Sequence, residues 1–387
     1  MPGFSFIRYP RPLRLQDRLE ANGPAIFQTV QSMFPVSMTS PKSSSAESCK
    51  LSGRFALHEK SPRVLIAGIA GASLGTEIAK ALNHAGGYDI LGCDISPLAF
   101  GHYDERFAST FLVDREGYAQ NLLDLCLREQ VDCIIPGGDE PAILIGRDHE
   151  LFTRAGIRLG QNNPQLTERL AHKGHCFEIL ESAGVRTPRT RTMDPGTDIG
   201  DFPMPCIVKP AVASGGSVFV FFVRSREEAR LYCTYLHNNG RTPILQEYLP
   251  EDRGEFTVGV LSLPDGSCAG AIALKRAFHS KLSVSMRGPD FLISSGYSQG
   301  LIEDFPAICE TAELIARRLG STGPLNIQGR VAADGTFVPF EINARFSAST
   351  YLRTLAGFNE VDWYVRHLLG LAPRAHSASL RDGICEP

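Results

Sequence analysis

Short apolar runs alternate with helix-like segments through the first patterned part of the chain. The runs have the length of single buried strands and lie at 63–71, 88–94 and 131–139. Between them, apolar residues recur at helical spacing over 76–86 and 121–130. Strands that alternate with helices form parallel sheets. The pattern therefore predicts a Rossmann-like α/β domain over residues 62–165.

The pattern changes after residue 165. A helical segment at 165–184 leads into short strands separated by turns, at 206–212, 217–223, 244–249, 254–263, 268–276 and 281–286. Hairpin turns are predicted at 264–266 and 334–335. Further helices are predicted at 225–237, 303–319, 349–357 and 360–370. Strands, hairpins and helices mixed in this way predict an α+β domain over residues 166–376.

The two ends of the chain lack these patterns. Residues 1–61 contain a Ser-rich stretch at 38–50, and arginines punctuate the start of the chain at Arg8, Arg11, Arg14 and Arg18. We interpret residues 1–61 as a disordered arm or linker, with an organelle-targeting segment as the alternative. Residues 377–387 are predicted to form a second tail.

The amino-acid composition argues against several classes of protein. Apolar residues make up 43% of the 387 residues and charged residues 21%, which is typical of folded domains. The 39 basic and 42 acidic residues give a net charge of −3, which argues against a nucleic-acid partner. The 10 cysteines form no CxxC pair, so the sequence favours reduced thiols in the cytoplasm over a zinc ribbon or a disulfide scaffold. No apolar run approaches the ~20 residues that a membrane span needs.

A glycine turn follows the first predicted strand. Gly68, Gly71 and Gly75 lie between this strand and a helix, where free N–H groups can bind phosphate. Asp94 ends the next strand, at the position of a ribose-binding acid in NAD-dependent enzymes. The spacing is GxxGxxxG, however, and dinucleotide folds use GxGxxG. We therefore favour glycines that allow tight strand–helix packing, and an NAD(P)-dependent oxidoreductase is the alternative.

A candidate phosphate site follows in the second domain. Lys209 lies near the end of a strand, and the SGGS segment at 214–217 follows it. The lysine supplies a charge and the loop supplies close backbone N–H groups, although either feature alone is commonly a surface charge or a plain turn. The strand at 244–249 carries Gln246 and Glu247, and such an edge can bind adenine and ribose. The alternative for this strand is a partly exposed sheet edge.

The most specific pattern lies between residues 323 and 350. Gln328 is on one predicted strand, and Glu341, Asn343 and Arg345 alternate along the next, so the last three share a face. Oxygen ligands of these types suit Mg²⁺, and an arginine can bind a phosphoryl group or a carboxylate. The opposite face is predicted to hold Phe340, Ile342 and Phe346. We favour a site over a solvated strand face.

Taken in order, these segments resemble the ATP-grasp enzymes over about residues 62–372. The series is a strand lysine, a glycine loop, a QEYL strand, a GEFTV strand, an N-x-Q strand and an E-I-N-x-R strand. It is most similar to the carbamoyl-phosphate synthetase large chain and the pyrrolysine-pathway ligase. The segments GASLGTEIAKAL and CIIPGGDEPA resemble the pre-ATP-grasp domain of that subgroup.

The resemblance implies roles for individual residues. Nucleotide contacts fall on Lys173, Lys209, Ser214, Gly215, Gly216, Ser217, Gln246, Glu247, Leu249 and Glu255. The implied ligands of Mg²⁺, or alternatively Mn²⁺, are Gln328, Glu341 and Asn343. The implied catalytic residues are Lys209, Arg345 and Arg276; Arg276 and Arg287 flank the loop where members bind their acid substrate. The sequence departs from the family at Ala344, at Ala348, and at Gln328, which replaces an acid.

The implied reaction is an ATP-dependent ligation of a carboxylate to an amine, or to a thiol, through an acyl phosphate, with release of ADP. The expected partners are small-molecule carboxylates and amines, without nucleic acid or membrane, and a homodimer is an alternative to a monomer. Two other functions stay open: the NAD(P)-dependent oxidoreductase, and an ATP-binding regulator without catalysis.

Overall fold

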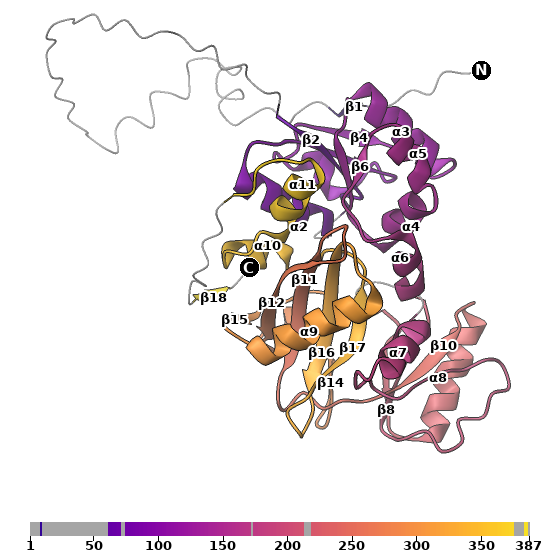
Figure 1. The fold of residues 1–387 in the computed structure, drawn as a ribbon. Helices are drawn as coiled ribbons and strands as arrows, with labels where there is room; N and C mark the ends of the chain where they lie inside the picture. Colours follow the sequence, from indigo (N-terminus) through magenta and orange to yellow (C-terminus); the bar gives the residue numbers. More distant parts are fainter. Residues whose placement is uncertain are drawn as a thin grey trace, which may run out of the picture.

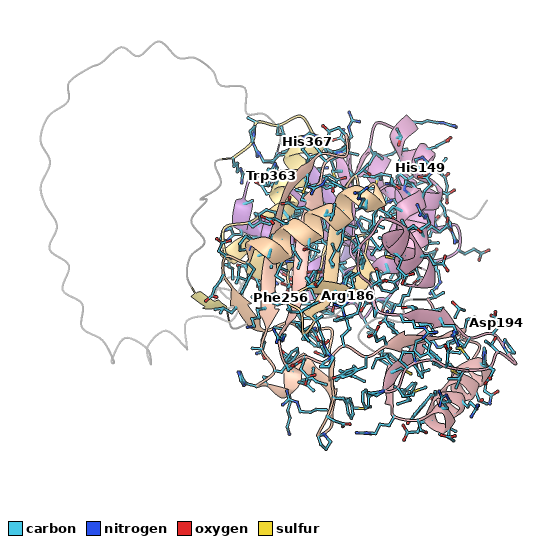
Figure 2. The ribbon with its side chains drawn as sticks, turned by 60° about the horizontal axis from the view of Figure 1, so that its bottom comes forward. His149, Arg186, Asp194, Phe256, Trp363 and His367 are labelled. Carbon is cyan, nitrogen blue, oxygen red and sulfur yellow. The ribbon has the colours of Figure 1, made fainter. Side chains whose placement is uncertain are left out.

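The computed structural model describes residues 8–9, 61–70, 74–171, 173–212, 218–374 and 383–385. Figure 1 shows a mostly parallel sheet with its helices at one end, a large antiparallel sheet in the middle, and a small antiparallel sheet with one helix at the other end. Figure 2 shows a second side, in which His149 marks the first part, Phe256 the large sheet and Asp194 the outer edge of the small sheet.

The first part is a six-stranded sheet in the order β1-β4-β3-β2-β5-β6. Its strands are β1 (Arg8–Tyr9), β2 (Arg63–Ala67), β3 (Asp89–Asp94), β4 (Ser109–Leu112), β5 (Cys133–Pro136) and β6 (Arg158–Leu159). The connecting helices are α2 (Leu74–Ala85), η1 (Phe100–Tyr103), α3 (Tyr118–Arg128), α4 (Asp139–Arg147) and α5 (His149–Arg154). All pairs are parallel except β1 with β4, which confirms the predicted parallel sheet.

Both faces of this sheet are covered, because every side chain of its central strand is apolar after the first. Val64 and Ile66 pack in one apolar cluster and Leu65 and Ala67 in another, on the two sides of β2. An apolar run without alternation is typical of such a doubly covered parallel strand. The first cluster also contains Val361 from the C-terminal helix α11 (Glu360–Leu368), so this helix joins the first part to the rest of the chain.

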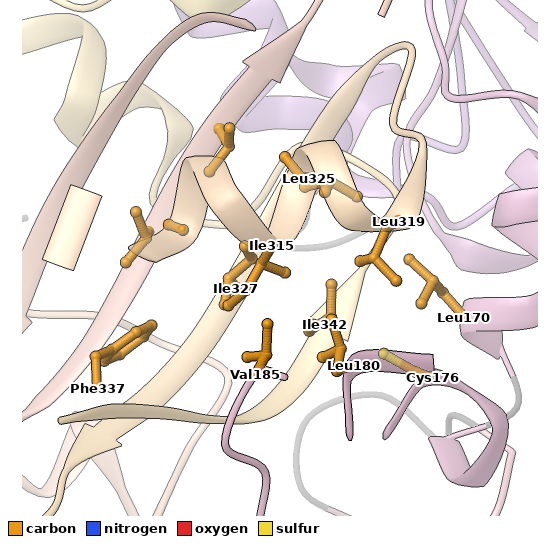
Figure 3. Close-up of a cluster of buried hydrophobic side chains, with 14 of the residues drawn as sticks. Leu170, Cys176, Leu180, Val185, Ile315, Leu319, Leu325, Ile327, Phe337 and Ile342 are labelled. Carbon is orange, nitrogen blue, oxygen red and sulfur yellow. The ribbon is translucent and has the colours of Figure 1, made fainter. Parts of the chain in front are cut away.

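The large sheet has the order β17-β16-β11-β12-β15-β18. Its strands are β11 (Glu255–Ser262), β12 (Cys268–Arg276), β15 (Gly300–Ile302), β16 (Pro324–Val331), β17 (Phe337–Asn343) and β18 (Gly383–Cys385). Helix α9 (Pro306–Leu319) lies across one face, and Figure 3 shows its Ile315 and Leu319 beside Leu325 and Ile327 of β16. The chain then continues through α10 (Thr350–Leu355) to α11.

The small sheet has the order β7-β10-β8-β9, with β7 (Thr190–Thr192), β8 (Cys206–Pro210), β9 (Phe221–Val223) and β10 (Pro243–Glu247). Helix α8 (Arg226–Asn238) packs against β8, β9 and β10. A separate hairpin, β13 (Val284–Arg287) with β14 (Leu292–Ser294), contacts this sheet. There Phe291 stacks on Phe222 with ring centroids 4.3 Å apart, and Arg224 pairs with Asp290 at 2.5 Å. The hairpin thus ties the small sheet to the large one.

Several predicted elements differ from the structure. The predicted helix 165–184 is two helices, α6 (Pro164–Ala171) and α7 (Lys173–Ser182), so the predicted domain boundary falls at the start of α6. The predicted strand 217–223 shortens to β9, and the predicted strand 281–286 begins with a single 3-10 turn, η2 (Lys281–Ser283). Helices α4 and α5 and strands β4, β7, β14 and β15 were missed, because short or polar segments carry little periodicity.

The predicted tails lie almost entirely outside the described residues. Two short strands within them are described, and both are paired: β1 with β4, and β18 with β15. Eight cysteines in the described ranges, from Cys93 to Cys309, are free thiols. Among the described helices, none is both long and apolar enough to cross a membrane.

Candidate active site

A cavity of about 430 Å³ opens where the three sheets meet. Gly137, Gly138 and Asp139 of the first part form one side, and β14 with the loop after it, residues 292–298, forms another. The cavity collects nine of the predicted site residues from five different elements and the loops beside them: Lys173, Lys209, Gln246, Glu247, Leu249, Gln328, Glu341, Asn343 and Arg345. The predicted loop at 214–217 lies outside the described residues.

Lys209 is buried at the floor of the cavity, where its ammonium group has two hydrogen-bond partners. Its Nζ donates to Gln246 Oε1 at 2.7 Å and to the carbonyl oxygen of Phe340 at 3.2 Å. Burial first, and then the charge of Lys173, lower the pKa of Lys209 to about 7 against the opposing effect of Glu341. The ammonium group is therefore short of negative charge, which a bound anion would supply.

A β-bulge places Phe340 differently from the prediction. Gln328 pairs with Glu341, but Gly329 pairs with Pro339, so Phe340 is the extra residue of β17. The bulge directs Phe340 to the cavity, whereas Ile342 and Phe346 pack in apolar clusters as predicted. The prediction that Phe340 faces away was therefore wrong, because strict alternation fails at a bulge.

Three oxygen-bearing side chains line one wall of the cavity. Gln328 lies opposite Glu341 in the β16–β17 ladder, and Asn343 follows two residues on. Lys173 Nζ is 3.7 Å from Glu341 Oε1. Burial acts to raise the pKa of Glu341, but the charges of Lys173, Lys209 and Arg345 together lower it, so the carboxylate stays ionised. Within the described ranges, the amides of Gln328 and Asn343 have no hydrogen-bond partner in the protein, so their oxygens are available as ligands.

This donor set fits a hard cation. One carboxylate and two amide oxygens suit Mg²⁺, which takes its remaining ligands from water and phosphate oxygens. The described residues contain no group of three His, Cys, Asp or Glu side chains that could hold a metal ion. A zinc site built from protein ligands alone is therefore not indicated in this part of the chain.

Arg345 binds an acid that the sequence analysis missed. Its Nε lies 2.6 Å from Asp139 Oδ1 and its Nη2 lies 3.2 Å from Asp139 Oδ2, a two-point contact between β17's end and the first turn of α4. Burial acts to lower the pKa of Arg345, but Asp139 raises it, so the guanidinium stays charged. The available signal was the polar exit PGGD of the third predicted strand, which we did not connect with the second domain.

Asn326 is the Asn of the N-x-Q strand, to which the sequence analysis gave no role. Its Oδ1 accepts from Thr257 Oγ1 and from Arg353 Nη2, both at 2.8 Å. Arg353 pairs in turn with Glu360 at 3.0 Å, and both side chains are fully buried. Two donors on the oxygen leave the amide nitrogen to face the cavity, so Asn326 offers hydrogen-bond donors there and not a metal ligand. Its spacing of two from Gln328 was the missed signal.

Glu255 and Arg276 do not line the cavity, so their predicted contacts with the nucleotide and the acid substrate stay predictions that this geometry does not favour. Glu255 is 0% exposed, and its two oxygens accept from Arg276 Nη1 at 3.1 Å and Arg330 Nε at 2.9 Å. Arg276 also donates to the carbonyl oxygens of Ser283 and Ser295. These buried charges therefore hold the loop that forms the cavity wall. Arg287 lies outside the cavity and donates to the Phe278 carbonyl.

The glycine turn of the first part serves close packing. Gly68 has φ +102°, and a Cβ atom on Gly75 or Gly137 would lie only 2.0 or 1.9 Å from the Gly68 oxygen. Asp94 accepts from the backbone N–H groups of Ile69 at 2.8 Å and Ser96 at 2.9 Å, one on each oxygen. The carboxylate is therefore satisfied within the turn, which disfavours the predicted alternative of a ribose contact. Gly71 lies outside the described residues.

Comparisons with known proteins agree with this architecture. Residues 240–384, less than half of the chain, match the family model "ATP-grasp in the biosynthetic pathway with Ter operon". The fold is similar to that of an L-amino acid ligase from Bacillus licheniformis, with a TM-score of 0.61 and 16% identity over 80% of this chain and 75% of that one. The chain has the ATP-grasp fold.

Two further ATP-grasp structures extend the comparison. An N5-carboxyaminoimidazole synthase from Aspergillus clavatus aligns with a TM-score of 0.56 and 15% identity, over 83% of this chain and 80% of that one. The biotin carboxylase domain of the Hydrogenobacter thermophilus 2-oxoglutarate carboxylase aligns with a TM-score of 0.58 and 19% identity, over 82% and 72%. No curated protein matches the sequence. The similarity to the carbamoyl-phosphate synthetase subgroup stays a prediction.

Proposed function

We propose that this ATP-grasp protein is an ADP-forming ligase that joins a carboxylate to an amine, or to a thiol, through an acyl phosphate. The observation that carries the proposal is the shared cavity. Lys173, Lys209 and Arg345 line it together with the oxygen donors of β16 and β17, and a fourth cation of its wall, Arg330, is paired with the buried Glu255. Such a site can hold a triphosphate and its metal ion together, with an acid beside the terminal phosphate.

In this proposal the residues act mainly by position and charge. Lys173 and Lys209 bind the phosphates, Arg345 binds the transferred phosphoryl group, and Gln328, Glu341 and Asn343 hold Mg²⁺ or Mn²⁺. The bound cation neutralises phosphate charge and orients the triphosphate. An oxygen of the substrate carboxylate attacks the γ-phosphorus in line and ADP leaves. The amine then attacks the acyl carbon, loses a proton, and phosphate is released.

The solved neighbours support these ligand classes. The Aspergillus clavatus synthase was solved with ADP and 5-aminoimidazole ribonucleotide, and the Hydrogenobacter thermophilus domain as a dimer with MgADP and bicarbonate. Both are similar to this chain in fold at low identity, so both support a bound adenine nucleotide, and the second also supports magnesium and the homodimer alternative. A cytoplasmic location belongs to the same proposal.

The test combines binding and turnover. The melting temperature of the full-length protein is measured with MgATP, with ATP and a chelator, and with NAD(P)H, and ADP release is then followed over pairs of acids and amines. Lys209→Ala should abolish both the MgATP effect and ADP release. The matched control is Lys275→Ala, since Lys275 is an exposed strand lysine away from the cavity.

Each outcome selects one function. Stabilisation by MgATP with ADP release that depends on acid and amine supports the ligase. Stabilisation by MgATP without ADP release from any pair indicates the ATP-binding regulator. Stabilisation by NAD(P)H alone overturns the proposal and places the function in the first domain.

A further inference from the structure

A second cavity, of about 230 Å³, lies beside the candidate active site at the carboxyl ends of the parallel strands. Its walls include Gly68 after β2, Ile95 after β3, Tyr118 at the start of α3, and Leu144 of α4. Gly137 and Gly138 line both this cavity and the main one. A ligand seated here can therefore extend into the candidate active site along the Gly137–Gly138 backbone.

The cavity occupies the position in the sheet where ligands are expected. Strand β2 pairs with β3 on one side and with β5 on the other, so the chain leaves β2 and β5 toward opposite halves of the sheet. In open α/β sheets, ligands bind in the crevice at this reversal of strand order. The main cavity, with the candidate active site, lies on the other side of Gly137 and Gly138. The proposed function gives the crevice no role.

The walls of the crevice are mainly apolar. Ala70, Ile95, Pro141 and Leu144 contribute to them, and Ile95 is 42% exposed at the rim. Tyr118 is only 7% exposed, and its hydroxyl group has no hydrogen-bond partner among the described residues. The hydroxyl group is not one of the buried polar atoms that lack a partner in this part of the chain, so it is open to the crevice and can donate to an acceptor atom of a ligand. The site thus combines an apolar surface with one donor.

The charged groups around the crevice favour a neutral ligand over a nucleotide or another anion. Each oxygen of Asp94 accepts one backbone N–H group, which limits its use for a ribose. Arg115 is paired with Glu140 and is not free for a phosphate. Lys173, Lys209 and Arg345 line the main cavity, where their charges attract the triphosphate and the acid, whereas Asp94 and Glu140 beside the crevice repel a carboxylate.

We propose that the crevice binds the apolar side group of the amine substrate, with Tyr118 donating a hydrogen bond to an acceptor of that substrate. The inference rests on the proposed ligase function and names the class of its second substrate: a primary amine with a branched aliphatic or aromatic group and a nearby carbonyl. A side group of this size fits within a space of about 230 Å³, and the amino group lies toward the shared glycines.

The experiment compares three probes on the full-length protein: glycinamide, leucinamide and isoamylamine. Binding is measured by calorimetry with and without MgADP, and ADP release is measured with MgATP and a panel of acids. Leucinamide should bind about tenfold or more tightly than glycinamide, because it buries an extra apolar side chain. Tyr118→Phe should weaken the binding of leucinamide about fivefold and leave the binding of isoamylamine unchanged, since isoamylamine has no carbonyl.

Two variants fill the crevice. Leu144→Trp fills it from α4, and Ile95→Trp fills it from the exposed rim, where folding is less at risk. Both should reduce leucinamide binding to the glycinamide level. The matched control is Leu127→Trp, at an exposed position of α3 outside both cavities, which should leave the preference intact.

The outcomes separate this inference from the function on which it rests. Equal binding of leucinamide and glycinamide, or a preference that survives both filling variants, overturns the inference. If amines stimulate ADP release without regard to their side group, the ligase stands and the inference fails. If leucinamide binds in the crevice but no acid gives ADP release, the ligase proposal fails and the apolar amine site stands.

Discussion

Glu255→Gln tests whether Glu255 holds the protein together or contacts the nucleotide. In the structure, Glu255 is fully buried between Arg276 and Arg330, with contacts of 3.1 Å and 2.8 Å. Glutamine keeps the shape but removes the negative charge. It also replaces one acceptor oxygen by an NH₂ group, which then faces a guanidinium donor. The buried Arg276 is left without a carboxylate partner, and Arg330 keeps only Glu251 at 3.8 Å.

The expected cost is large. Removal of one partner from a buried ion pair costs about 3–5 kcal/mol, because the remaining charge stays buried without compensation. The stability of a typical domain is about 5–15 kcal/mol, so the loss is a substantial fraction of the total. The same substitution at Glu313, whose side chain is 31% exposed and lies 3.6 Å from Arg317 on α9, should cost about 0.5 kcal/mol or less.

The assay is urea unfolding of the wild type, Glu255→Gln and Glu313→Gln, with the affinity for MgATP measured on each folded protein. We expect a lower midpoint for Glu255→Gln and nearly the wild-type midpoint for Glu313→Gln. A Glu255→Gln protein that keeps wild-type stability and loses nucleotide affinity would refute this reasoning. Glu255 would then act at the nucleotide, as the family resemblance implied.

Three further expectations follow from other parts of the structure. A bound triphosphate raises the pKa of Lys209 from about 7, so the protein should take up a proton when it binds MgATP at pH 8. Calorimetry in two buffers of different ionisation enthalpy measures this proton uptake. Lys209→Met should abolish the proton uptake. Without nucleotide, the unfolded chain holds this proton more tightly, so stability should rise between pH 7 and 10, less so in Lys209→Met. Gly137→Ala should cost about 3 kcal/mol or more in unfolding free energy because its Cβ meets the Gly68 oxygen, whereas Gly156→Ala, with open space around it, should cost about 1 kcal/mol. Phe291→Ala should speed hydrogen exchange in residues 284–294 about fivefold by removing the stack on Phe222, and unchanged exchange would contradict this contact.

The sequence was sufficient for the architecture because its signals are local. Unbroken apolar runs marked the parallel strands, and alternation placed Glu341, Asn343 and Arg345 on one face, where the structure has them. The bulge at Phe340 was not predictable in this way, since one extra residue leaves the composition of a strand unchanged. Alternation is a rule for regular ladders only.

Long-range pairs were beyond the sequence for a different reason. Asp139 and Arg345 are 206 residues apart, and nothing local to either residue indicates the other. Likewise, the sequence around Glu255 does not indicate whether this side chain contacts a nucleotide or two buried arginines. The identity of a charged side chain's partner depends on the packing of whole sheets, so roles assigned from resemblance need the tertiary contacts before they can be separated from structural ones.

In the proposed ligase, a phosphoryl group and Asp139 compete for the guanidinium group of Arg345. Where the phosphoryl group replaces Asp139, the free energy of the contact with the first turn of α4 is subtracted from the affinity for the ligand. Thermodynamic reciprocity requires the converse. A change that weakens the contact between Asp139 and Arg345 increases the affinity for the nucleotide by the same factor. In the proposed ligase, the position of the first domain and the affinity for the nucleotide are therefore coupled through Arg345.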